Sequence, residues 1–150
     1  MKILTLTFSL LLVANLVLAQ LDPYTDFETS DEVTYISTIK INANMGPYYL
    51  EGLEKTWVAA MKYQKEKGYI TDYKVFVSDL PQSGDFNLIT AITYANDAAA
   101  RGSETRFNDV QAHMKSLATS EEERDKIVTQ SYPSMRKIVG QYRIRELTFK

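Results

Sequence analysis

The chain contains no cysteine and only one histidine among its 150 residues. Without cysteine it forms no disulfide bond, and it carries no lipid anchor of the bacterial lipoprotein type, because that anchor is attached to a cysteine. A structural zinc site needs about four nitrogen or sulfur ligands, which a single histidine does not provide. We therefore expect no metal site and a fold that is stabilised by packing alone.

Recognisable catalytic motifs are missing as well. The nucleophile elbow G-x-S-x-G does not occur, and Gln82-Ser83-Gly84 is typical of a turn. The six glycines are scattered and form no phosphate-binding loop. His113 is the one histidine available to a Ser-His-Asp arrangement. The sequence therefore predicts no specific reaction, and we expect no cofactor.

An excess of positive charge is the third absence. The chain has 17 basic and 19 acidic residues, a formal net charge of -2, and removal of Lys2 with an N-terminal signal lowers this value by one. Such a charge gives no attraction to the phosphates of nucleic acids or to anionic lipids. We therefore expect no nucleic-acid partner.

The longest apolar run lies at the N-terminus. A short basic start is followed by an almost unbroken apolar stretch to Leu18, and Ala19–Gln20 has the character of a cleavage site. This pattern is typical of a secretory signal peptide, and the stretch is too short for a stable membrane span. A retained anchor is less favoured because Asn15 interrupts the run. We expect residues 1–19 to be removed, leaving a periplasmic or extracellular protein without stable membrane insertion.

The rest of the chain has the size of one domain. Residues 20–32 are acidic, contain no basic residue and are interpreted as a solvated leader, so the domain is expected to span 33–150. Apolar spacing predicts strands at 33–42, 70–79, 86–95 and 142–149 and a helix over 46–68. A second helix is expected from Ser103, with a new start at a Ser120–Glu123 capping box. Because of Pro133 this helix is expected to be kinked or split near Tyr132, and it ends at Gly140.

Residues 80–84 are typical of the turn between two paired strands, so the second and third strands are expected to form a hairpin. The order strand, helix, strand, strand, helix, strand is that of the ferredoxin-like plan. The predicted class is therefore α+β, with a βαββαβ order, a four-stranded antiparallel sheet, and helices on one face of it.

This order, the long first helix and the tight hairpin resemble the dimeric α+β-barrel superfamily over about Val33 to Lys150. The resemblance implies a homodimer whose sheets pair across a two-fold axis, with a cavity between sheet and helices. Members include cofactor-independent oxygenases, haem-degrading enzymes, lactone isomerases, dye-decolourising peroxidases and stress-induced proteins. The fold therefore does not decide the chemistry.

Quinone-forming and haem-degrading oxygenases of this superfamily use an asparagine on the first strand, a tryptophan and often a histidine. The resemblance makes Asn42 and His113 the candidate catalytic residues. Trp57 is a less direct counterpart, because the apolar spacing places it on the first helix and not on a strand. For His113, a packed or hydrogen-bonded side chain is favoured over a ligand to haem. The candidate ligand-binding residues are Asn42, Trp57, Tyr73, Tyr94, His113 and Arg145.

Two further features leave alternatives open. The ten tyrosines reflect either strand propensity, which is favoured, or a cavity lined by rings. Arg143 and Arg145 either protect a strand edge, which is favoured, or hold a carboxylate.

Three functions follow: an exported homodimer that binds a small, partly apolar molecule; alternatively a cofactor-independent oxygenase or isomerase; or a structural or stress-related dimer without ligand.

Overall fold

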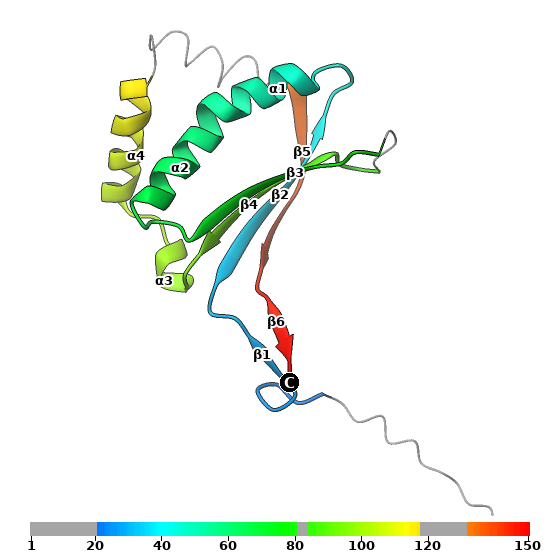
Figure 1. Cartoon of the computed structure of the whole chain (residues 1–150), viewed down its shortest axis with the longest axis vertical. Helices are drawn as coiled ribbons and strands as arrows, with labels where there is room; N and C mark the ends of the chain where they lie inside the picture. The colour runs from blue at the N-terminus through cyan, green and yellow to red at the C-terminus, as the bar shows by residue number, and fades with distance from the viewer. Residues whose placement is uncertain (1–20, 81–83, 118–131) are drawn as a thin grey trace, which may run out of the picture.

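The computed structural model describes residues 21–80, 84–117 and 132–150. Its centre is a four-stranded antiparallel sheet in the order β3-β4-β2-β5 (Figure 1). This order is that of the ferredoxin-like plan, so the predicted α+β class and the predicted antiparallel sheet are confirmed. The strands are β2 (Val33–Ile41), β3 (Asp72–Val77), β4 (Leu88–Tyr94) and β5 (Arg136–Ile144).

The predicted first helix is one long helix with an irregular middle. It consists of α1 (Gly46–Leu53), the π-helical turn η1 (Glu54–Val58) and α2 (Ala59–Glu66), which follow one another without a break and are called the long helix below. Pro47 lies in its first turn, where the missing N–H costs no hydrogen bond. Gly68 ends it with a positive φ of 70°.

The second helical region begins as the sequence predicts. Ser103 caps α4 (Glu104–Leu117), its side chain accepting a hydrogen bond of 3.2 Å from the N–H of Arg106. A short helix, α3 (Asp97–Ala100), precedes it and is capped by Asn96. Helix α4 packs against α2 on the same side of the sheet as the long helix (Figure 1). The predicted signal peptide and the Ser120–Glu123 capping box lie outside the described residues.

The core lies between the sheet and the long helix. Alternate residues of β2 and β4 point toward the helix, as a strand period of two requires. The buried cluster is formed by Ile39, Ile41, Tyr49, Leu53 and Leu88, and Trp57, Val58 and Met135 pack against it.

The prediction of a helix that continues to Gly140 is wrong. Helix α6 (Tyr132–Met135) ends five residues earlier, and β5 begins at Arg136 and pairs with β2. Ile138 and Val139 are β-branched and favour strands, and their apolar run fits either period when read alone. Pro133 belongs to α6, and the helix that is predicted to bend there lies mostly outside the described residues.

The two ends of the domain form a second, smaller sheet that the sequence did not predict. Strand β1 (Phe27–Thr29) lies in the acidic segment and pairs with β6 (Leu147–Phe149). The rings of Phe27 and Phe149 meet edge to face with centroids 6.3 Å apart. The predicted last strand at 142–149 is thus divided between two sheets, and part of the 20–32 segment is paired (Figure 1).

Candidate functional site

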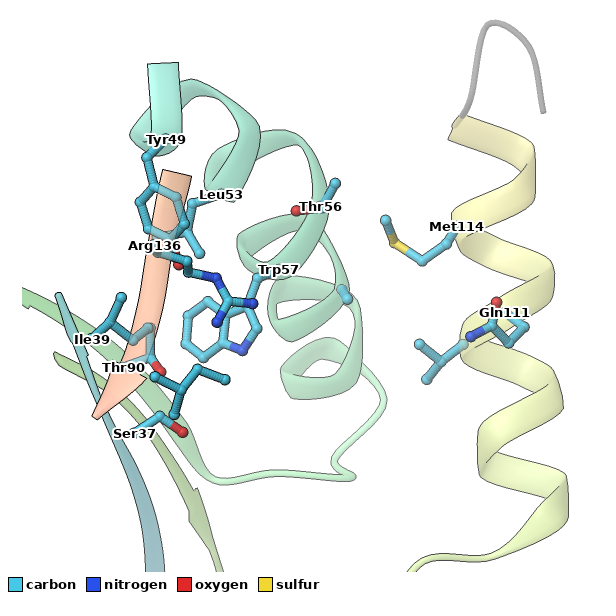
Figure 2. Close-up of a pocket in the computed structure, with 13 residues that line it drawn as sticks. Ser37, Ile39, Tyr49, Leu53, Thr56, Trp57, Thr90, Gln111, Met114 and Arg136 are labelled. Carbon is cyan, nitrogen blue, oxygen red and sulfur yellow. The ribbon is translucent and has the colours of Figure 1, made fainter. Parts of the chain in front are cut away.

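A cavity of about 560 Å³ lies between the sheet, the long helix and α4 (Figure 2). Its volume is in the range of sites for small molecules. Apolar side chains form most of the lining, together with a few hydroxyl and amide groups and one charged group. The lining residues are Ser37, Ile39, Tyr49, Leu53, Thr56, Trp57, Ala60, Thr90, Val110, Gln111, Met114, Arg136 and Ile138.

The sheet provides the floor of the cavity. Ser37 of β2 lies opposite Thr90 of β4, and Ile39 of β2 lies opposite Ile138 of β5, so the register brings these four side chains to one face. Arg136 lies two residues before Ile138 and therefore shares its face. The floor thus combines two hydroxyl groups, two isoleucines and one guanidinium group.

The π-helical turn supplies the centre of the opposite wall. Thr56 and Trp57 both belong to η1, and the Thr56 hydroxyl donates a 2.7 Å hydrogen bond to the carbonyl of Gly52 one turn earlier. Such turns insert one residue into an α-helix and occur frequently at functional sites. Here the irregular turn coincides with the cavity wall.

Trp57 is the one predicted ligand-binding residue that lines this cavity. Its ring contacts Tyr73 of β3 edge to face, with centroids 5.9 Å apart and planes at 80°. Tyr73 therefore lies behind Trp57 and supports its orientation from the sheet, outside the lining itself. Two of the predicted residues are brought together in this way.

Arg136 is a charged lining residue that the sequence did not indicate. Its side chain points from β5 toward the long helix, between Tyr49 and Trp57 (Figure 2). The guanidinium carbon lies 5.9 Å from the centroid of the Tyr49 ring, which is a cation–π distance. The sequence pattern predicts a helix at this residue, and a helix does not place it on the inner face of a strand.

Asn42, the predicted catalytic asparagine, directly follows β2 and is not among the residues that line the cavity. Its backbone N–H donates to the carbonyl of Met135 at 2.9 Å, and its side-chain amide donates to the carbonyl of Ser134 at 2.8 Å. These two bonds join the end of β2 to α6. The side-chain amide of Asn42 thus holds the backbone of α6 just before β5 begins.

His113, the other predicted catalytic residue, packs between two helices. Its ring stacks on that of Tyr63 of α2, with centroids 3.8 Å apart and planes at 6°. His113 is not among the lining residues, although Gln111 and Met114 of the same helix are. Tyr94 is also outside the lining, and its ring meets that of Tyr35 edge to face with centroids 5.7 Å apart.

The two arginines at the end of β5 hold neighbouring segments together. Arg143 and Arg145 both pair with Asp97, the first residue of α3. Arg145 also donates 2.9 Å hydrogen bonds to the carbonyls of Ser30 and Asp31. Neither arginine belongs to the cavity lining, so these contacts connect β5 with α3 and with the segment before β2.

A polar cluster fixes α4 against the end of the long helix. The hydroxyls of Tyr63 and Tyr69 donate to the two carboxylate oxygens of Asp109, at 2.9 and 3.0 Å. These bonds, that of Tyr63 first, lower the pKa of Asp109 from its ordinary value of 3.8. The hydrogen bond to Asp109 raises the pKa of Tyr69 above its ordinary value of 10.0.

The folded state lowers the pKa of Asp109 below its ordinary value of 3.8. The ionised carboxylate therefore stabilises the folded protein above about pH 3.8, and this contribution is lost as the pH falls through the folded pKa. We expect the protein to lose more thermal stability than Asp109→Asn does between about pH 6 and about pH 3. Thermal unfolding followed by far-ultraviolet circular dichroism measures the difference. The exposed Asp79→Asn serves as control and is expected to behave as the wild type. Equal losses in wild type and Asp109→Asn would contradict the assignment.

The described residues form neither a metal-binding cluster nor a helix that spans a membrane. Within 21–80, 84–117 and 132–150, no three acidic or histidine side chains gather in a way that holds a metal ion. In the same part of the chain, no helix has both the length and the apolar character needed to cross a membrane.

Comparison with known proteins gives similarity of fold. No protein-family model matches the chain, and no curated protein matches it. Protein SO0527 from Shewanella oneidensis is 9% identical with a TM-score of 0.49, the match covering 81% of this chain and 98% of that one. A dimeric protein of unknown function and ferredoxin-like fold from Bacteroides fragilis is 11% identical with a TM-score of 0.41, covering 82% and 100%.

SnoaB, a cofactor-independent oxygenase from Streptomyces nogalater, is also similar. It is 11% identical with a TM-score of 0.37, and the match covers 81% of this chain and 94% of that one. A shared fold at such identities assigns no chemistry, because one fold carries many unrelated activities. The ferredoxin-like assignment itself rests on the strand order described above.

Proposed function

We propose that this chain is an exported homodimer that binds a small, partly apolar molecule in the cavity between its helices and its sheet. The observation that carries the proposal is the cavity itself, with a volume of about 560 Å³. Sites for small molecules are concave, mostly apolar and provided with a few polar groups that fix orientation. The side chains of Ser37, Thr56, Thr90 and Gln111 supply such groups.

Binding is favoured over the oxygenase or isomerase alternative by the positions of the candidate residues. Of Asn42, Trp57 and His113, Trp57 alone lines the cavity. The amide of Asn42 is bonded to the carbonyl of Ser134, and the ring of His113 is stacked on Tyr63. A general acid or base must reach the reacting atoms, and neither candidate is placed to do so.

The homodimer proposal rests on the face of the sheet that points away from the helices, called the open face below. The strand period and register place Ile36, Phe76, Ile89, Tyr142 and Ile144 there. Phe76 is 52% exposed, Tyr142 55% and Ile144 45%. An apolar patch on a soluble protein marks an interaction surface, and pairing with the same patch of a second copy covers both by one symmetric contact.

Export is supported by the N-terminal sequence. The basic start, the apolar run to Leu18 and the Ala19–Gln20 cleavage position form a secretory signal, and these residues precede the described part of the chain. Removal of the signal leaves the whole domain intact, because β1 begins at Phe27. The proposed mature protein begins at Gln20.

Native mass spectrometry of the protein recovered after export from a bacterial host tests these statements together. We expect the mass of a dimer of chains beginning at Gln20, with an additional small mass bound to each copy. We expect Ala60→Phe, which fills the cavity, to lose the bound mass and to remain dimeric. Ala98→Phe, at an exposed position on α3, is the matched control and is expected to retain it.

Each part of the proposal has its own contrary result. A monomer at micromolar concentration would contradict the homodimer, and a mass that includes residues 1–19 would contradict cleavage. Recovery of the wild-type protein with no bound mass, together with a cavity that takes up no added small molecule, would favour the structural or stress-related dimer without ligand.

A further inference from the structure

Among the described residues that line the cavity, Arg136 alone is charged. Arg136 extends from β5 into the space between the long helix and the sheet, and its Nε atom is buried. The other lining residues that the structure describes are apolar, hydroxyl-bearing or amide-bearing, and none of them is acidic. The lining therefore carries a single positive group that faces the interior of the site.

A guanidinium group in such a place is suited to a particular kind of partner. It carries five N–H donors in a fixed planar arrangement, so it can keep contacts with the protein and still donate to a ligand. Its geometry matches a carboxylate through two parallel hydrogen bonds. The strength of such charge-assisted bonds increases where water is excluded.

The rest of the lining fits the apolar part of the same molecule. Arg136 lies beside Tyr49 and Trp57 at one side of the cavity, and Met114 projects from α4 across from them (Figure 2). Val110 of α4 and Leu53 of the long helix add further apolar surface to the lining. The charge of Arg136 is thus separated from the apolar side chains that α4 contributes, as a ligand with one charged end requires.

From this separation we infer that the ligand is a small organic acid with an apolar body, and that Arg136 binds its carboxylate. The inference rests on the proposed function, because it specifies which class of molecule occupies the same cavity. The apolar body lies against Leu53, Val110 and Met114. The ring of Trp57 flanks the site of the carboxylate.

Trp57 provides a direct readout, because it is the one tryptophan in the chain and it lines the cavity. Three probes of equal chain length but different charge, decanoate, 1-decanol and decylamine, are titrated against the dimer while tryptophan fluorescence is recorded. We expect decanoate to bind at least about tenfold more tightly than 1-decanol, since its charged carboxylate makes stronger hydrogen bonds to Arg136 than the neutral hydroxyl does. Decylamine is expected to bind most weakly.

Substitution of Arg136 separates recognition of charge from recognition of the apolar body. Arg136→Gln is expected to lose the preference for decanoate, at least about tenfold, and to keep its affinity for 1-decanol. Retained 1-decanol binding also shows that the variant is folded with its cavity intact. Arg136→Lys keeps the charge without the planar fork and is expected to recover part of the preference. Arg101→Gln, at an exposed arginine outside the cavity, is the matched control and is expected to match the wild type.

The outcomes distinguish the inference from the function on which it depends. Equal affinity of the wild type for decanoate and 1-decanol would overturn the carboxylate assignment and leave the binding function standing. An unchanged preference for decanoate in Arg136→Gln would overturn the role of Arg136. Absence of any fluorescence change with all three probes would overturn both the inference and the proposed function.

Discussion

Leu88→Ala is expected to lower the free energy of unfolding by about 3 kcal/mol. Leu88 has 0% of its surface exposed and belongs to the buried cluster beneath the long helix. It lies on β4 between two neighbouring strands, opposite Ile39 of β2 and Val77 of β3. Because hydrogen bonds on both sides fix this backbone, the structure cannot close over the removed side chain, and the cost of a void adds to the lost apolar burial.

Urea denaturation measures this loss, with wild type and variant compared at equal protomer concentration because association with a second copy adds to apparent stability. Leu80→Ala is the matched control, since the side chain of Leu80 is 68% exposed. It is expected to change the free energy of unfolding by less than about 0.5 kcal/mol. A similar loss in the two variants would show that Leu88 does not occupy the core as described.

The parts of the fold that the sequence predicts well are those fixed by local chemistry. The alternation that begins at Val33 gives β2, and the first-turn Pro47 and the terminal Gly68 delimit the long helix. Ser103 likewise caps α4 as predicted. In each case the residues that determine the element are neighbours in the sequence, so no knowledge of the tertiary structure is required.

The segment 136–140 was assigned incorrectly because its structure depends on a distant partner. Ile138 and Val139 are compatible with a helix or a strand, and pairing with β2, about a hundred residues earlier in the chain, selects the strand. The same error concealed Arg136. A charged residue at the start of a strand faces a cavity or solvent according to register, which the sequence alone does not give.

The candidate site shows the same limit. Resemblance to a superfamily makes Asn42, Trp57 and His113 candidate site residues. Of these three, the structure places Trp57 alone in the cavity lining. The cavity floor comes from β2, β4 and β5, through residues such as Ser37 and Thr90 that carry no distinctive motif. Their common face follows from pairing between strands far apart in the sequence.

Tyr142→Asp is expected to raise the dissociation constant of the proposed homodimer by at least about a hundredfold. The Tyr142 ring lies on the open face above Gly140, where a Cβ atom would come within 2.6 Å of the tyrosine hydroxyl. Because the side chain is 55% exposed, the substitution is tolerated by the folded protomer. In a two-fold symmetric contact both subunits carry the substitution. Two carboxylates are then buried in the interface without a positive group or hydrogen-bond donor to replace their water.

Sedimentation velocity over a range of micromolar concentrations measures the change. Gln141→Asp is the matched control: it introduces the same charge at the neighbouring residue of β5, which is also exposed but faces the helices. We expect this control to remain a dimer, because net charge alone does not separate the subunits. If both variants dissociate equally, general repulsion explains the effect. If neither dissociates, the subunits associate through a surface other than the open face.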